Sequence, residues 1–136
     1  MDILGTLFSG LPVLIGQFAA TLALLGIGFA CYNALTPFNE RELVRQGNVA
    51  AGVVVAGTLV SLAVPLGATL ANSGSTLDII IWGLVALIIQ LLTFLAATFL
   101  IKNLRVMIEG GNVSAALVLV GIQLAVALLN AGSMSG

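Results

Sequence analysis

Few side chains in this sequence could perform covalent chemistry or hold a metal ion. The 136 residues include no histidine and one cysteine, Cys31. A metal site needs several nitrogen, sulfur or carboxylate ligands, and a hydrolase needs a nucleophile beside a base. The acidic residues are expected at helix ends or at the water edge of a membrane. The sequence therefore predicts no catalytic residue, no metal site, no cofactor and no enzyme activity.

A small polar set interrupts the long apolar segments. It consists of Gln90, Thr93, Gln123 and Asn130. An amide surrounded by hydrocarbon must find a hydrogen-bond partner, and such bonds commonly hold transmembrane helices together. The same set could instead line a narrow polar path at an interface between protomers. Both interpretations stay open on the sequence alone.

The four basic residues form a second set that could bind something. They are Arg41, Arg45, Lys102 and Arg105. Cations beside a membrane attract anionic surfaces, with a contribution of about 1 kcal/mol each. We expect a cytoplasmic docking surface for membrane lipid or for a cytoplasmic or membrane protein, and no binding of nucleic acid. These cations could equally serve only to set the topology.

Long apolar segments must hold the polar residues and the basic residues in place. Charged residues make up 7% of the chain, against about 25% in soluble domains. Residues 3–39, 46–77, 79–101 and 110–136 contain none, and each window can hold the roughly 20 apolar residues that cross a bilayer. The pattern predicts an all-α membrane protein, a bundle of four transmembrane helices in one domain, 1–136. We expect helices near Leu11–Ala34, Asn48–Ala71, Leu77–Ile101 and Asn112–Ala131.

The basic residues also predict the orientation of the bundle. All four lie in two short connections, one after the first helix and one after the third. Lys and Arg in short loops stay in the cytoplasm because their translocation is costly. Both termini and the Asn72–Asp78 connection should therefore face the periplasm or exterior. Whether residues 1–10 continue the first helix stays open.

The chain contains an internal tandem repeat. The segment 47–51, Gly-Asn-Val-Ala-Ala, recurs 64 residues later as Gly-Asn-Val-Ser-Ala at 111–115. Copy one covers about 11–71 and copy two about 77–132. Each copy is a helix, a short basic connection and a second helix, so the two copies run parallel. We expect a pseudo-two-fold axis along the membrane normal to relate them.

The connections carry helix signals of their own. Thr36 and Pro37 suit the N-cap and first residue of a short helix over Phe38–Gln46. Its apolar residues Phe38, Leu43 and Val44 are then available to the lipid interface. Gly47 can end that helix in the left-handed conformation, and Asn48 can cap the next one. The second connection should repeat this pattern over Lys102–Glu109.

Small and polar residues recur at steps of three and four along each long helix. Such faces let transmembrane helices pack closely, within a bundle or between protomers. We expect them to form the bundle contacts and to support a homo-oligomer. The residues are Gly16, Ala19, Ala23, Gly26, Ala30 and Asn33; Gly52, Ala56 and Ala63; Gly83, Ala86, Gln90, Thr93 and Ala97; and Ala116, Gln123, Ala127 and Asn130.

The combined motifs resemble a known family. They are Thr36-Pro37, Glu40, Glu42, residues 44–51 (Val-Arg-Gln-Gly-Asn-Val-Ala-Ala), Trp82-Gly83, Gln90, residues 109–113 (Glu-Gly-Gly-Asn-Val) and Leu129-Asn130-Ala131. In these residues the chain resembles the YjfL-type small bacterial inner-membrane proteins, domain of unknown function 350. The resemblance covers nearly the whole chain from Gly16. It implies a multi-pass location in the bacterial inner membrane and assigns no mechanism.

Two functions fit these observations. The first is a homo-oligomeric structural or interaction protein with a basic cytoplasmic face. The alternative is a passive channel or conduit lined by the intramembrane amides. No intramembrane carboxylate is expected, which argues against an ion-coupled carrier.

Overall fold

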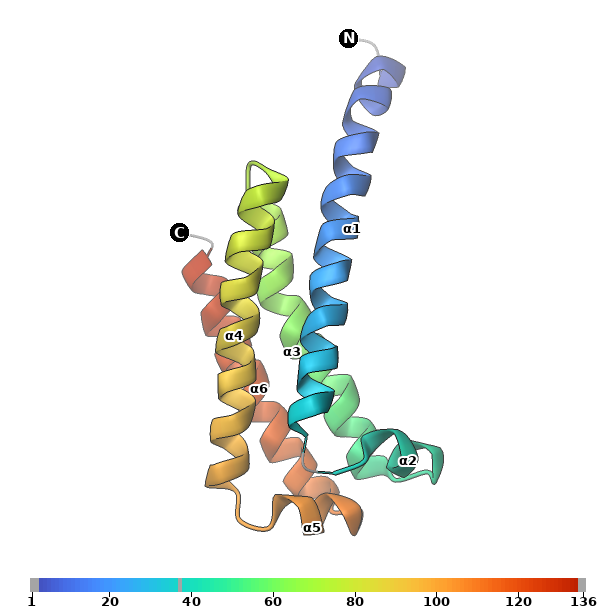
Figure 1. Ribbon diagram of the computed structural model, residues 1–136, viewed down its shortest axis with the longest axis vertical. Helices are drawn as coiled ribbons and strands as arrows, with labels where there is room; N and C mark the ends of the chain where they lie inside the picture. Colours follow the sequence, from blue (N-terminus) through green and yellow to red (C-terminus); the bar gives the residue numbers. More distant parts are fainter. Residues whose placement is uncertain (1–2, 37, 135–136) are drawn as a thin grey trace.

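The computed structural model describes residues 3–36 and 38–134, and the described chain is helical throughout (Figure 1). Its helices follow one another in the order long, short, long, and then again long, short, long. They are α1 (Ile3–Leu35), α2 (Glu40–Arg45), α3 (Val49–Asn72), α4 (Thr76–Leu100), α5 (Leu104–Glu109) and α6 (Val113–Met134).

The four long helices confirm the predicted membrane-spanning segments. They are long and apolar enough to cross a bilayer, and the shortest, α6, has 22 residues. At 1.5 Å per residue it extends about 33 Å, which covers the hydrocarbon core. Helix α1 begins eight residues earlier than expected, because residues 3–10 continue it. Figure 1 shows this end of α1 projecting past the rest of the bundle.

Helix α3 is the central element of the bundle. It packs against α1, α4 and α6, and α4 packs in turn against α1 and α6. A pseudo-two-fold axis would make the α1–α6 contact match the α3–α4 contact. In the described residues α3 and α4 pack together, whereas α1 and α6 are not a closely packed pair. The predicted pseudo-two-fold arrangement is therefore wrong for the protomer.

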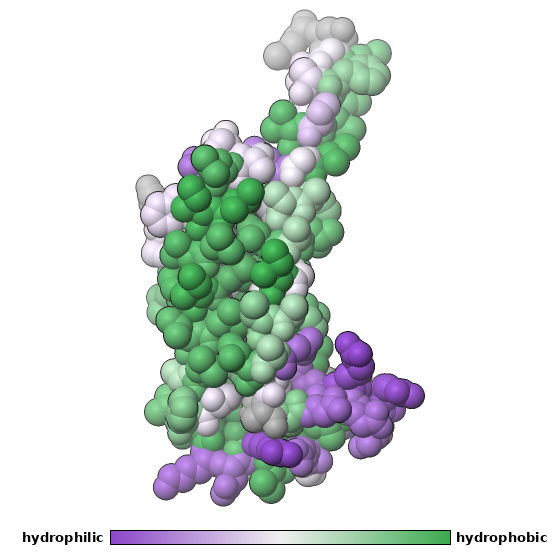
Figure 2. All heavy atoms as spheres, in the orientation of Figure 1, coloured by the Kyte–Doolittle hydropathy of each residue, from purple (hydrophilic) through white to green (hydrophobic). Residues whose placement is uncertain are grey.

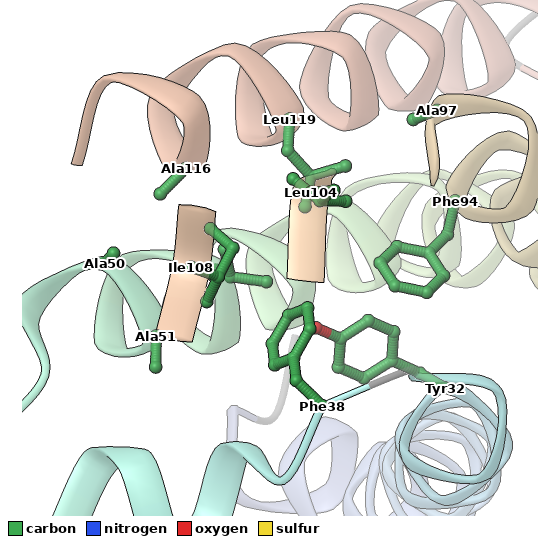
Figure 3. Close-up of a cluster of buried hydrophobic side chains, with 11 residues drawn as sticks. Tyr32, Phe38, Ala50, Ala51, Phe94, Ala97, Leu104, Ile108, Ala116 and Leu119 are labelled. Carbon is green, nitrogen blue, oxygen red and sulfur yellow. The ribbon is translucent and has the colours of Figure 1, made fainter. Parts of the chain in front are cut away.

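The two short helices close one end of the bundle. Leu104 and Ile108 of α5 are buried beneath α3 and α6, close to the aromatic rings of Tyr32 and Phe94 (Figure 3). The centroids of those two rings lie 4.7 Å apart in an edge-to-face arrangement. A second buried cluster lies farther along the bundle and consists of Leu24, Leu62, Leu66, Ile79 and Leu87.

The start of the first short helix differs from the prediction. The Thr36 hydroxyl donates to the carbonyl of Tyr32 at 2.6 Å, which closes the last turn of α1 instead of capping α2. Asn39 caps α2 by accepting from the Glu42 amide. Phe38 is only 6% exposed, so its predicted position at the lipid interface is wrong: the ring lies in the buried cluster beside the ring of Tyr32 (Figure 3). The predicted role of Pro37 lies outside the described residues.

The corners that follow the short helices confirm the predicted caps. Gly47 and Gly111 both have φ 81°, the left-handed conformation that glycine adopts without strain. The Asn48 side chain accepts from the Ala51 amide at 3.0 Å, and Asn112 accepts from the Ala115 amide at 3.1 Å. The same corner geometry therefore occurs twice, 64 residues apart.

The predicted small-residue faces are buried in only half of the bundle. In α4 and α6 the predicted residues are buried, apart from the half-buried Thr93. In α1 all six predicted residues are exposed, and the buried residues are Leu24, Gly28 and Tyr32. In α3 the buried face contains Thr58 and Leu62 instead of Ala56 and Ala63. The prediction is wrong for α1 and α3 because their opposite faces meet α4 and α6.

Gly57 lies at a tight contact between α3 and α6. A Cβ atom at Gly57 would lie 2.4 Å from a methyl carbon of Val120, whose branched side chain cannot move aside easily. Gly57→Ala should lower the free energy of unfolding by about 1–3 kcal/mol, the usual cost of overpacking. Thermal unfolding of the detergent-solubilised protein measures this loss.

Gly67→Ala is the matched control on the same helix, since a Cβ atom there meets open space. It should leave stability unchanged or raise it slightly. Equal stability of the two variants would contradict the close α3–α6 packing at Gly57.

Candidate functional site

Four buried polar side chains join α3, α4 and α6. The Gln123 side-chain nitrogen donates to the Thr58 hydroxyl at 3.1 Å, and the Gln90 side-chain nitrogen donates to the backbone carbonyl of Gln123 at 3.2 Å. Asn130 donates to the Gln90 side-chain oxygen at 3.4 Å and to the Ala86 carbonyl at 3.3 Å. We call Thr58, Gln90, Gln123 and Asn130 the amide cluster. Its bonds link three helices where hydrocarbon supplies no competing partner.

The structure brings together three of the four predicted polar residues and adds one. Thr93 lies outside the amide cluster, because its hydroxyl donates to the Ile89 carbonyl of its own helix at 2.8 Å. Thr58 was missed by the sequence analysis. Its spacing from Ser61, Pro65 and Thr69, each three or four residues from the last, could have marked a buried face of α3. The Oδ1 atom of Asn130 is buried without a partner among the described residues.

A buried carboxyl group lies between α1 and α2, which the sequence analysis also missed. The Tyr32 hydroxyl donates to Oε1 of Glu40, and Glu40 is only 5% exposed. Its other oxygen, Oε2, has no partner in the described part of the chain. Burial raises the pKa of Glu40 to about 7, and the Tyr32 hydrogen bond opposes this rise. Glu40 lies at a helix end, as expected of the acids, but its carboxyl group is buried.

The four predicted basic side chains are exposed at one end of the molecule (Figure 2). Helices α2 and α5, with the connection before α5, hold them there (Figure 1). Arg105 pairs with Glu109 at 2.8 Å, and Arg45 lies 3.9 Å from Glu42. Arg41 and Lys102 have no ion-pair partner among the described residues. This end therefore exposes four cations, two of them paired with acids of their own helix.

A double-mutant cycle tests the bond between Thr58 and Gln123. Thr58→Val and Gln123→Leu should each destabilise the protein, and together they should cost less than the sum, because both remove the same interaction. The coupling should be about 0.6–1.7 kcal/mol, as for hydrogen bonds between membrane helices. Thermal unfolding in detergent measures it. Thr93→Val with Gln123→Leu is the control pair and should be additive; additivity in both pairs would contradict the amide cluster.

Glu40 predicts a pH dependence of stability. Its pKa is about 7 in the folded protein against an ordinary value of 4.5, so the folded state binds the proton more tightly. The free energy of unfolding should therefore fall as pH rises from about 4.5 to about 7, by on the order of 3 kcal/mol. Unfolding measured across this range should show the slope. Glu40→Gln should remove it and Glu42→Gln, an exposed neighbour, should retain it; the same slope in Glu40→Gln would refute the assignment.

Comparison with known proteins gives a family. Residues 6–134 match the family model described as Domain of Unknown Function (DUF350). The chain is 32% identical over 114 residues to the inner membrane protein YjfL of Escherichia coli K12, covering 84% of this chain and 86% of that protein. The same figures hold for YjfL of Escherichia coli O157:H7. No solved structure matches. With its four membrane-length helices, this chain is a multi-pass inner-membrane protein and belongs to the DUF350 family.

Proposed function

We propose that this protein is a homo-oligomeric interaction protein of the inner membrane, whose basic end docks an anionic surface in the cytoplasm. The main support for this proposal is that one end of the molecule exposes all four basic residues, Arg41, Arg45, Lys102 and Arg105 (Figure 2). Glu42 and Glu109 are the exposed acids at this end, and the cations outnumber them. A surface of this kind attracts acidic protein segments and anionic headgroups alike.

The proposed orientation follows from the same residues. Translocating Lys and Arg in short loops is costly, so the end formed by α2 and α5 belongs in the cytoplasm. The N- and C-terminal ends of the chain then belong on the periplasmic side. In support, the opposite end of the bundle carries one charged residue among those described, Asp78, which is acidic.

The proposal includes a tandem repeat of helix, short helix and helix. What supports it is the duplicated corner. The Asn48 amide donates to the Leu43 carbonyl at 2.9 Å, and the Asn112 amide donates to the Met107 carbonyl at 2.8 Å, in each case beside a left-handed glycine. A duplicated corner with the same caps and the same bond pattern fits a duplicated unit.

The alternative, a passive conduit, has less support. Gln90, Gln123 and Asn130 are buried within the protomer, where their side-chain nitrogens donate hydrogen bonds inside the amide cluster, so they do not face a path between protomers. Thr93 bonds to its own helix. The geometry favours helix clamping as the role of these side chains.

Charge reversal tests the docking surface. Arg41→Glu with Arg105→Glu should weaken binding to an anionic surface by at least about 30-fold, since each cation contributes about 1 kcal/mol. Two probes separate the sources: vesicles rich in phosphatidylglycerol, and a labelled polyglutamate peptide. Binding is measured on protein reconstituted in neutral lipid with the α2–α5 end outward.

The matched control keeps the charge. Arg41→Lys with Arg105→Lys should bind both probes nearly as the native protein does. If the reversed variant binds both probes with native affinity, or the native protein binds neither, these residues act only in topology and the docking proposal is wrong.

A further inference from the structure

Residues 64 positions apart bury opposite faces of their helices. Seven residues of α4 are buried, and all seven counterparts in α1 are exposed. The reverse also holds: Leu24, Gly28 and Tyr32 are buried in α1, and their counterparts Ile88, Leu92 and Ala96 are exposed in α4. The exposed counterparts in α1 are Ile15, Ala19, Leu22, Ala23, Gly26, Ala30 and Asn33.

The α3–α6 pair follows the same rule only in its middle, because the counterparts Ala51 and Leu66 near its two ends are buried in α3 just as Ala115 and Asn130 are in α6. Gln123 and Ala127 are buried in α6, whereas their counterparts Leu59 and Ala63 are exposed. We call the face that copy two buries face A, and the face that copy one buries face B. Inside the protomer, face A of copy two packs on face B of copy one. In the described residues, the α1 part of face A in copy one and the α4 part of face B in copy two are exposed and have no protein partner.

The contact inside the protomer fits large side chains over small ones. Leu87 fills the space over Gly28, where an added Cβ atom would lie 2.5 Å from its methyl carbon. Leu24 fills the space over Gly83, where the corresponding distance is 2.6 Å. These two contacts seat α4 against α1.

Replacing each residue in these two contacts by its counterpart 64 positions away, in the other copy, gives a second set of residue pairs. This set predicts a second interface in which large side chains again lie over small ones. The counterparts of Gly28 and Leu87 are Leu92 and Ala23, so a large residue again faces a small one. The counterparts of Leu24 and Gly83 are Ile88 and Ala19, which pair in the same way. Both large residues, Ile88 and Leu92, are well exposed at 57% and 59%. Small residues on the facing surface are typical of helix contacts in membranes, because lipid-facing positions favour large apolar side chains.

A polar contact at the corners supports the same pairing. The Asn48 side chain donates to the Ile108 carbonyl at 2.8 Å, joining the corner of copy one to the end of α5. Asn112 occupies the equivalent corner of copy two, where it is exposed. Its side-chain nitrogen has no partner among the described residues. The counterpart of the Ile108 carbonyl is that of Val44 at the end of α2, which accepts the Gly47 amide and has room for a second donor.

We propose that a second copy of the chain occupies these faces: face A of copy one packs on face B of copy two in the neighbouring protomer. The two surfaces differ, so the contact is heterologous and every protomer can offer both. All protomers must keep one orientation across the bilayer, so repetition about an axis along the membrane normal closes a ring. This inference rests on the homo-oligomer and tandem repeat of the proposed function, and specifies how the protomers meet.

Cysteine cross-linking in native membranes tests the contact. In a Cys31→Ser background, Ala23→Cys with Leu92→Cys in one chain should give a ladder of disulfide-linked oligomers on mild oxidation. Neither single variant should cross-link alone, and co-expression of the two single variants should give a dimer. Phe18→Cys with Leu92→Cys is the control, since Phe18 and its counterpart Trp82 are both exposed; this pair should stay monomeric.

The outcomes separate this inference from the broader proposal. A dimer from either single variant would indicate an isologous interface and overturn the ring, although the homo-oligomer would stand. Absence of cross-links in every variant, with a monomeric particle in detergent and in native membranes, would overturn both. The Ala23→Trp variant is a further check. Ala23 is exposed in the protomer, so this variant should fold normally, but the oligomer should dissociate to a monomer. An unchanged particle mass would contradict the ring.

Discussion

Hydrocarbon offers no hydrogen bonds, so every polar atom in the four long helices must find its partner inside the protein. Helical backbone meets most of this demand, and hydrogen bonds of the buried polar side chains meet much of the rest, although Oδ1 of Asn130 has no partner among the described residues. Gln90 donates to a backbone carbonyl of α6, and Gln123 bonds to Thr58 of α3. The same constraint gathers the exposed cations at the end formed by α2 and α5 (Figure 2). The amide cluster and the basic end both arise because hydrocarbon neither forms hydrogen bonds nor solvates charge.

The short helices do more than connect the spans. Leu104 and Ile108 pack beneath the bundle, and Phe38 enters the same cluster from the chain before α2 (Figure 3). The Tyr32–Glu40 hydrogen bond ties α2 to the end of α1. The helix that carries Arg41 and Arg45 is therefore attached to the bundle through a carboxyl group whose pKa is about 7. The basic end and the bundle core are joined by this hydrogen bond as well as by the apolar contacts.

The asymmetry between the two halves has a simple packing origin. Two parallel hairpins related by a two-fold axis would bury the same face twice. Here Leu87 of α4 fits over Gly28 of α1, so the small-residue face of copy two is covered while that of copy one stays open. The protomer is therefore left with two different exposed surfaces, the α1 part of face A in copy one and the α4 part of face B in copy two. A heterologous assembly joins two different surfaces of this kind.

The sequence by itself determined the four spans, their order, both glycine corners and the shared end of the four cations, because charge placement and local caps act within one helix and its neighbours in the chain. It also identified Gln90, Gln123 and Asn130 as polar groups in need of partners. Only the tertiary structure decided which face each helix buries. Helix α1 offers a small-residue face and a face with Leu24 and Tyr32, and both are apolar enough to pack. The same holds for Glu40, whose burial depends on where the end of α1 lies. The face that a helix buries depends on the shape of the helices beside it. The residue pattern within one helix does not contain that information.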